Sequence, residues 1–142
     1  MTPDGGYIRA SASATVTLPA VVVFTVVNVI DAEVFSLDTS TGILTVLEAG
    51  VYEIVSQIQG STSLNKFTVV ADIQIEVGGS WISQTSPLAN TGELGAGGGD
   101  PDGRTVVRLT ANQRVRVSAT GTGSSIERYN NLTMLQAYKI GE

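Results

Sequence analysis

Apolar and polar side chains alternate along most of this chain, most regularly in residues 41–59. This stretch predicts two strands separated by a break at Ala49-Gly50. In the second strand the alternating sets are Tyr52, Ile54 and Ile58 on one side and Glu53, Gln57 and Gln59 on the other. A side-chain period of two is typical of a β-strand that buries one face. We expect the remaining strands to pack against this pair.

The rest of the chain predicts further strands of the same kind. They cover residues 20–30, 34–37, 66–77, 104–109, 114–119 and 132–140, with one more strand beginning at Trp81. Gly78-Gly79 indicates a two-residue hairpin turn, and residues 110–113 a second turn. Residues 86–103 form the longest irregular region, and loops of that length are often functional. No amphipathic helix is evident, so we expect about eight to ten antiparallel strands in a sandwich or barrel.

Three segments carry more specific expectations. Residues 20–30 are apolar on both faces as far as Asn28, which predicts a strand covered by the opposite sheet and by another subunit. In the last strand, Leu132, Met134, Tyr138 and Ile140 share one face. Residues 1–17 are small and polar, so we interpret them as an extended N-terminal arm that attaches to a neighbouring subunit, with a frayed tail as the alternative. Residues 18–142 then form one domain.

Composition excludes several functional classes. The net charge of −5 argues against nucleic-acid binding, which normally requires a basic face. The chain has no cysteine and no histidine, which removes disulfides, thiolate metal sites, the commonest general base and the commonest transition-metal ligand. The N-terminus lacks the pattern of a signal peptide, and residues 20–30 are too short to span a bilayer. We therefore expect no enzyme, no cofactor and no membrane partner, and folding in a cytoplasm.

Two groups of charged residues are candidate sites. Glu93, Asp100 and Asp102 could collect a hard cation such as calcium, but they match no complete binding-loop motif and are more simply read as solvated turn acids. The second group is Arg104, Arg108, Arg114 and Arg116, half of the eight basic residues. If their two strands pair as a hairpin, these arginines could share a face and contact an acidic partner. The simpler reading is a solvated sheet face.

Aromatic residues divide between core and interface. Phe24, Phe35, Tyr52 and Tyr138 suit either the core of a sandwich or contacts between subunits, because alternation does not say which side of a sheet is covered. Trp81, the only tryptophan, is interpreted as a packing residue, with ligand binding as the alternative.

The order of these features resembles the jelly-roll family of complement-type globular heads and tumour necrosis factor-like domains. The matching elements are Asp38, Gly42-Ile43-Leu44, the Gly50-Val51-Tyr52 corner with Ile54, Leu109, Val115-Arg116-Val117, and residues 132–138. The resemblance covers residues 21–140. The chain departs from the family at Asn112-Gln113, where a Gly-Asp pair is common, and its core is richer in Val, Ile and Leu than in Phe.

The resemblance implies a jelly-roll β-sandwich that forms a threefold trimer. We expect Phe35, Tyr52, Ile54 and Tyr138 at the trimer interface. Similar domains occur in bacteriophage virions, and a chain without a collagen-like stalk or cysteine looks more like that version. The leading hypothesis is a non-enzymatic capsid decoration (cement) protein, a homotrimer whose partner is the major capsid protein, with Tyr7, Ile8 and Arg9 of the arm touching the shell.

Two alternatives remain. One is the receptor-binding tip of a phage fibre or spike, in which the loops at residues 60–65, 86–103 and 121–131 recognise a host glycan or protein. The other is a small carbohydrate-active enzyme, for which Glu93, Asp100 and Asp102 would have to provide the carboxylates.

Overall fold

The computed structural model describes residues 6–12, 20–57, 60–62, 66–84, 88–93, 102–122, 127–129 and 134–142. In these ranges the chain forms β-strands and no helix. The strands are β1 (Tyr7–Ser11), β2 (Ala20–Val21), β3 (Val26–Ile30), β4 (Phe35–Leu37), β5 (Leu44–Val46), β6 (Gly50–Gln57), β7 (Gly60–Thr62), β8 (Lys66–Val77), β9 (Ser80–Ser83), β10 (Leu88–Glu93), β11 (Asp102–Leu109), β12 (Arg114–Thr122), β13 (Glu127–Tyr129) and β14 (Met134–Gly141).

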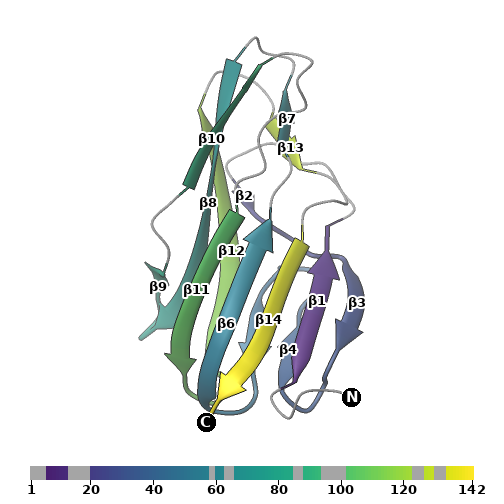
Figure 1. The fold of residues 1–142 in the computed structure, drawn as a ribbon, viewed down its shortest axis with the longest axis vertical. Coiled ribbons are helices and arrows are strands. Elements are labelled where there is room, and N and C mark those ends of the chain that lie inside the picture. Colours follow the sequence, from purple (N-terminus) through teal and green to yellow (C-terminus); the bar gives the residue numbers. More distant parts are fainter. Residues whose placement is uncertain are drawn as a thin grey trace.

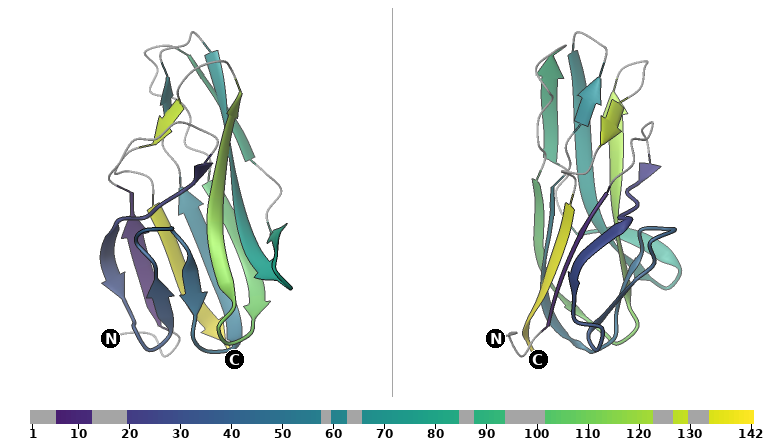
Figure 2. Two further views of the ribbon diagram at one scale, coloured as in Figure 1. Left: turned by 180° about the vertical axis from the view of Figure 1, so that it is seen from behind. Right: turned by 90° about the vertical axis from the view of Figure 1, so that its right-hand side faces the viewer.

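Two antiparallel sheets pack face to face (Figure 1). Sheet A has five strands in the order β11-β6-β14-β1-β3. Sheet B has seven: β10-β8-β12-β5-β4 in order, with β2 pairing β12 and β9 pairing β8. Figure 2 shows the two layers edge-on, and β7 and β13 form a small separate ribbon. The predicted all-β sandwich is confirmed, with more strands than expected because several are only two to four residues long.

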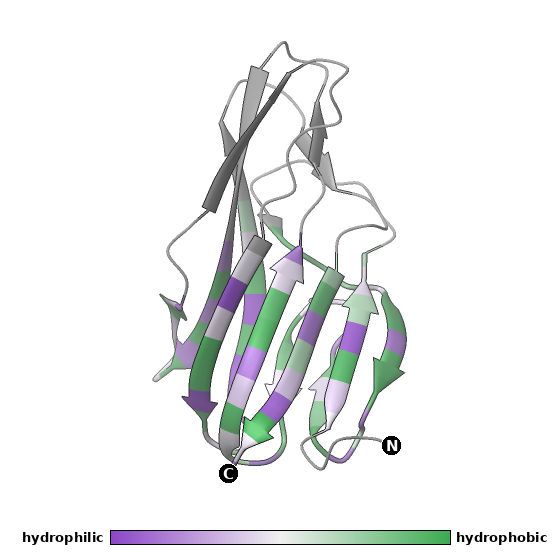
Figure 3. Cartoon of the chain, viewed as in Figure 1, coloured by the Kyte–Doolittle hydropathy of each residue, from purple (hydrophilic) through white to green (hydrophobic). Residues whose placement is uncertain are grey.

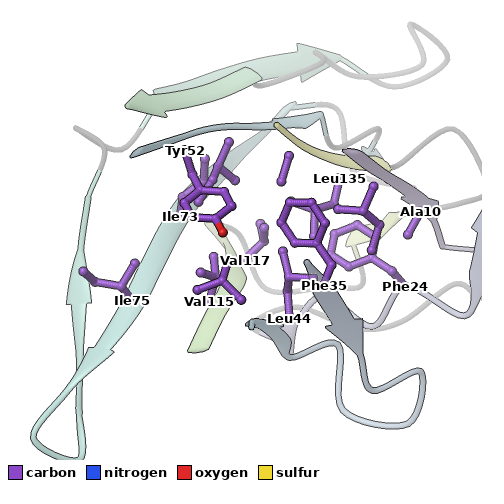
Figure 4. Close-up of a cluster of buried hydrophobic side chains, with 14 of the residues drawn as sticks. Ala10, Phe24, Phe35, Leu44, Tyr52, Ile73, Ile75, Val115, Val117 and Leu135 are labelled. Atoms are coloured by element: carbon purple, nitrogen blue, oxygen red, sulfur yellow. The ribbon is translucent and has the colours of Figure 1, made fainter. Parts of the chain in front are cut away.

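The core fills the space between the sheets with alternate residues of each strand. In β6 the burial pattern is strictly alternating, with Tyr52 and Ile54 fully buried. The largest buried side chains are Tyr52, Phe24, Phe35, Ile8, Leu44, Ile54, Ile73, Leu109, Leu135 and Val22. Figure 4 shows many of them converging from both sheets. Each such side chain contributes roughly 1.5–3 kcal/mol by leaving water, so this layer holds the sandwich together.

The predicted N-terminal arm is, in its described part, a strand of the domain itself. β1 lies between β14 and β3 in sheet A, and Ile8, Ala10 and Ala12 are fully buried. The arm interpretation is therefore wrong for residues 6–12. It arose because three of the four buried positions are glycine or alanine (Gly6, Ala10 and Ala12), which give a weak hydrophobic signal.

Residues 20–30 are not one covered strand. The chain forms β2, leaves the sheet, and returns as β3 at the free edge of sheet A. All five residues of β3 are exposed, and the large apolar ones are Val26, Val27, Val29 and Ile30. Figure 3 shows this edge as mostly hydrophobic. The opposite sheet covers Val22 and Phe24, which are fully buried, but it does not cover β3, so that part of the prediction is wrong.

The region predicted as a long irregular loop contains ordered strand at both ends. β10 pairs with β8 through Leu88–Glu93, and β11 begins at Asp102. The polar, glycine-containing sequence of β10 shows no alternation of apolar and polar residues, so the sequence pattern did not predict this strand. Residues 94–101 lie outside the described part.

A buried lysine occupies the corner between β6 and β14. The Lys139 side chain is only 6% exposed, and its Nζ lies 3.0 Å from Glu142 Oε2 and 3.2 Å from Glu48 Oε1. Gly50 makes room for it, since a Cβ at that position would lie 2.6 Å from Lys139 Cε. The hydrogen bonds to Glu142 and Glu48 raise the pKa of Lys139, against the opposing effect of burial. Nothing in the sequence pattern singled out this lysine.

Alkaline pH is expected to remove the stabilisation that Lys139 provides. Because the pKa is raised in the folded state, this contribution is complete below the ordinary lysine value of 10.5 and is lost as the pH rises through the folded value. The melting temperature of the native protein should therefore fall relative to that of Lys139→Met as the pH is raised past 10.5. Parallel pH profiles for the two proteins would contradict this assignment.

Substitution of Gly42 by alanine is expected to destabilise the fold strongly. Gly42 has φ of +79°, and an added Cβ would lie 2.1 Å from the carbonyl oxygen of Val22. Gly79→Ala is a matched control, since Gly79 has φ of +87° with nothing within 4 Å of the added atom. Both variants carry the strain of positive φ, so the clash should cost Gly42→Ala about 2 kcal/mol more than the control in urea unfolding. Equal losses would show that the turn relaxes.

Candidate functional site

The outward face of sheet A, called the A face below, is the candidate site. It is formed by the residues of β11, β6, β14 and β1 that alternate with the buried ones. The outward side chains include Tyr7, Arg9, Val51, Glu53, Val55, Gln57, Arg104, Val106, Arg108, Met134, Gln136 and Tyr138. They are half-buried or exposed, and Val106 is 57% exposed. The face is thus a mixture of aliphatic, aromatic and polar groups without a covering layer in the single chain.

Two tyrosines stack at the middle of the A face. Tyr7 of β1 lies opposite Tyr138 of β14 in the register, and their ring centroids are 4.7 Å apart with an interplanar angle of 30°. The Tyr138 hydroxyl donates a hydrogen bond to Gln136 Oε1 at 2.8 Å. Burial, together with the neighbouring Tyr138, raises the pKa of Tyr7. This pair is a large, rigid and partly exposed aromatic surface, of the kind that concentrates at protein interfaces.

A shallow hollow lies beside the tyrosine pair. It is lined by Val55, Gln57, Gly103, Arg104, Met134 and Gln136. Its floor is apolar at Val55 and Met134, and its rim offers two amides and one guanidinium. The hollow is suited to an inserted side chain of a partner, which would bury apolar atoms and meet polar groups at the rim.

Charges on the A face are few and weakly paired. Arg104 lies 4.0 Å from Glu53, with 70% and 30% of the two side chains exposed. Such an exposed pair contributes about 0–1 kcal/mol. Among the described residues Arg9 makes a long contact from its guanidinium to Met134 Sδ at 3.9 Å, and Arg108 donates to the carbonyl oxygen of Glu142 at 3.1 Å. The face can therefore be covered without desolvating a strong ion pair.

The structure divides the four predicted trimer-interface residues. Phe35, Tyr52 and Ile54 are at most 1% exposed, and Phe35 packs edge-on against Tyr52 with ring centroids 5.6 Å apart at 69°. The Tyr52 hydroxyl is also used internally, donating to the Glu48 carbonyl at 2.6 Å. These three side chains belong to the core of one chain, so the interface assignment is wrong for them. Tyr138 alone lies on the A face.

The predicted capsid contacts are also divided. Ile8 is fully buried in the core, so it has no surface to offer a shell. Tyr7 and Arg9 lie on the A face beside Tyr138. Tyr7 and Arg9, predicted to touch the shell, therefore lie on the same surface as Tyr138, predicted to lie at the trimer interface. The predicted shell contact and the predicted trimer contact are thus not on separate surfaces.

The four arginines do not form one cluster. β11 pairs with β6 in sheet A, whereas β12 pairs with β8, β5 and β2 in sheet B. Arg104 and Arg108 therefore lie on a different sheet from Arg114 and Arg116. The prediction of a shared face required β11 and β12 to pair as a hairpin, and they do not pair. A tight turn is typical of a hairpin, but here it carries the chain from one sheet to the other.

The acidic candidates remain without a structural account. Asp100 and the side chains of Glu93 and Asp102 lie outside the described residues. Among the side chains that the structure does describe, no three acidic residues come close enough to hold a metal ion. In the same part of the chain no helix is long and apolar enough to cross a membrane.

Comparison with known proteins identifies the fold. No family model matches the chain and no curated protein is similar to it in sequence. Among solved structures, murine APRIL at pH 5.0 superposes with a TM-score of 0.71 at 11% identity, covering 96% of this chain and all of that one. The globular domain of zebrafish complement 1qA gives a TM-score of 0.66 at 15% identity, covering 96% and 98%. At such identities the similarity concerns the fold alone: the chain is a jelly-roll β-sandwich like those of tumour necrosis factor-like and complement-head domains, as its sequence motifs predicted.

Proposed function

We propose that this protein is a non-enzymatic structural protein that assembles as a homotrimer through its A face and decorates a bacteriophage capsid. The stacked Tyr7–Tyr138 pair on the central strands of sheet A carries the trimer proposal. A trimer is also what the jelly-roll family resemblance implies. The virion role and the localisation to a phage particle rest on the cysteine-free composition and on the resemblance to phage decoration domains.

The chemistry of the A face supports self-association. Val55, Met134 and the tyrosine pair form an apolar centre, and Arg9, Arg104 and the glutamines surround it. Protein interfaces have this arrangement of an apolar core and a polar rim, with aromatic residues, Met and Arg enriched. A stable interface buries about 800 Å² on each partner, an area that most of a five-stranded sheet can supply.

The exposed edge strand β3 extends this surface. Val29 is 52% exposed and pairs in register with Arg9 of the A face. A free, apolar edge strand invites association with other chains unless something covers it. In a ring of identical subunits the contact is heterologous, so the edge of one copy meets a different surface of the next. We propose that a neighbouring copy covers β3. The sequence likewise predicted that another subunit covers residues 20–30.

The shell would then be bound by another surface of the trimer. Attachment at three equivalent points gives avidity, so each single contact needs only modest affinity. Binding to the assembled shell alone would stabilise it by mass action.

Introducing a negative charge on the A face should abolish the trimer. Val106→Asp and Tyr138→Asp are each expected to lower the trimer association constant at least about tenfold, because the carboxylate would lose its water in the interface. The measurement is light scattering, which distinguishes the 14.8 kDa chain from its trimer. Thr45→Asp on the outward side of sheet B is the matched control and should remain trimeric. A monomeric wild-type protein, or unchanged trimers in both A-face variants, would overturn the proposal.

Capsid binding is tested separately with a panel of phage capsids stripped of their decoration protein. The wild-type protein should co-sediment with a matching capsid and raise its disruption temperature. The monomeric A-face variants should bind at least about tenfold more weakly, because they lose threefold attachment. A trimer that binds no capsid in the panel, but binds bacterial cells or glycans, would exclude decoration in favour of a receptor-binding tip.

One observation favours the receptor-binding alternative. The strands β7, β10 and β13 lie within the three regions predicted as loops, and they gather at the end of the molecule opposite the C-terminus (Figure 1). One end of a β-sandwich is a common position for a recognition surface. The same cell and glycan measurements decide between the two functions.

A further inference from the structure

The outward face of sheet B carries a stacked arrangement of one tryptophan and two arginines. Trp81 of β9 and Glu76 of β8 are register partners, and Arg116 of β12 pairs with Gln74 of β8. The guanidinium carbon of Arg116 lies 4.3 Å from the Trp81 ring centroid, and that of Arg114 lies 5.5 Å from it. Three neighbouring strands thus bring these side chains together.

The two arginines differ in how their charge is compensated. Arg114 forms a two-point ion pair with Glu76, through Nε to Oε1 at 3.1 Å and through a terminal nitrogen to Oε2. Arg116 donates only from Nε, to the neutral Gln74 Oε1 at 2.8 Å. Among the described residues no carboxylate lies within ion-pair distance of Arg116, and its terminal nitrogens have no hydrogen-bond partner. Asp72, the other acid on this face, accepts bonds from Ser83 at 2.6 Å and Gln74 at 3.2 Å.

Arg116 is also partly removed from water. Its side chain is half-buried, and burial lowers the pKa of its guanidinium with no opposing carboxylate. A half-buried cation held over an indole, whose terminal N–H groups have no partner among the described residues, is a preorganised donor pair. Placing a carboxylate in front of it would supply the missing charge at little cost in side-chain entropy.

We propose that Trp81 and Arg116 form a docking site for a carboxylate side chain of an acidic protein segment. The terminal nitrogens of Arg116 bind the two carboxylate oxygens, and Trp81 holds the guanidinium in place. Trp and Arg are the residue types that most often dominate binding energy at protein interfaces. This site lies on the opposite sheet from the A face, so it is independent of the proposed trimer contact.

The charge of the chain favours a single carboxylate over a polyanion. With a net charge of −5, the protein repels nucleic acids and other continuous lines of negative charge. The Trp81 ring is already occupied by guanidinium groups, so it is not an open platform on which a sugar ring would stack. The outward face of a sheet suits an extended segment that presents one acidic side chain to Arg116.

The test uses the intrinsic fluorescence of Trp81, the only tryptophan in the chain. The probe is a short serine-rich peptide with one central glutamate, and its control replaces that glutamate by glutamine. We expect a saturable change in Trp81 emission with the glutamate peptide alone, weakened several-fold by added salt. No saturable response, or an equal response to the glutamine peptide, would overturn the proposal.

Variants assign the response to Arg116. Arg116→Gln should weaken binding of the glutamate peptide at least about tenfold, corresponding to a lost charged hydrogen bond. Arg116→Lys keeps the charge without the planar fork and should weaken it several-fold; it also serves if the first variant fails to fold. Arg108→Gln, at an exposed arginine of sheet A, should stay within about twofold of wild type. Unchanged binding in both Arg116 variants would overturn the site.

Binding measurements with two other anions test which class of ligand the site prefers. Inorganic phosphate that binds as tightly as the glutamate peptide would overturn the choice of a carboxylate. An oligomer of glucuronate that binds while the peptide does not would overturn the choice of a protein partner.

Discussion

The apolar layer between the two sheets is the constraint on which the rest of the structure depends. Its centre is the contact between Phe35 and Tyr52, one aromatic from each sheet, with the Tyr52 hydroxyl satisfied by the Glu48 carbonyl. Since strands of both sheets must present alternate residues to this layer, the opposite residues are committed to the outside. At the corner between β6 and β14, Gly50 leaves room for the buried side chain of Lys139, which is paired with Glu48.

The two outward faces then receive different chemistry. Sheet A exposes the Tyr7–Tyr138 pair, aliphatic side chains and the apolar edge strand β3, a surface suited to another copy of the chain. Sheet B exposes an ion pair and the Trp81–Arg116 arrangement, a surface suited to a charged partner. The two proposed contacts lie on opposite faces of the sandwich, so they would not compete for the same surface.

Several elements were predictable because their causes are local. The hairpin turn at Gly78 and Gly79 follows from residues that accept positive φ, and the observed values are 58° and 87°. The buried alternation of β6 follows from its own side chains. In β14, alternation correctly placed Met134 and Tyr138 on one face, but it carries no information on which face meets the other sheet. The sequence therefore could not show that Tyr52 and Tyr138, both expected at an interface, lie on opposite sides of sheet A.

By itself the sequence determined the all-β class, most strand positions and the jelly-roll order, because side-chain period and turn residues act over short distances. Tertiary structure alone decided that Ile8 belongs to the core, that β3 is an exposed edge, and that β11 and β12 separate into different sheets. It also decided that Trp81 lies against Arg116. These outcomes depend on which strands pair across long separations in the chain, and strand pairing is set by the packing of the whole sandwich.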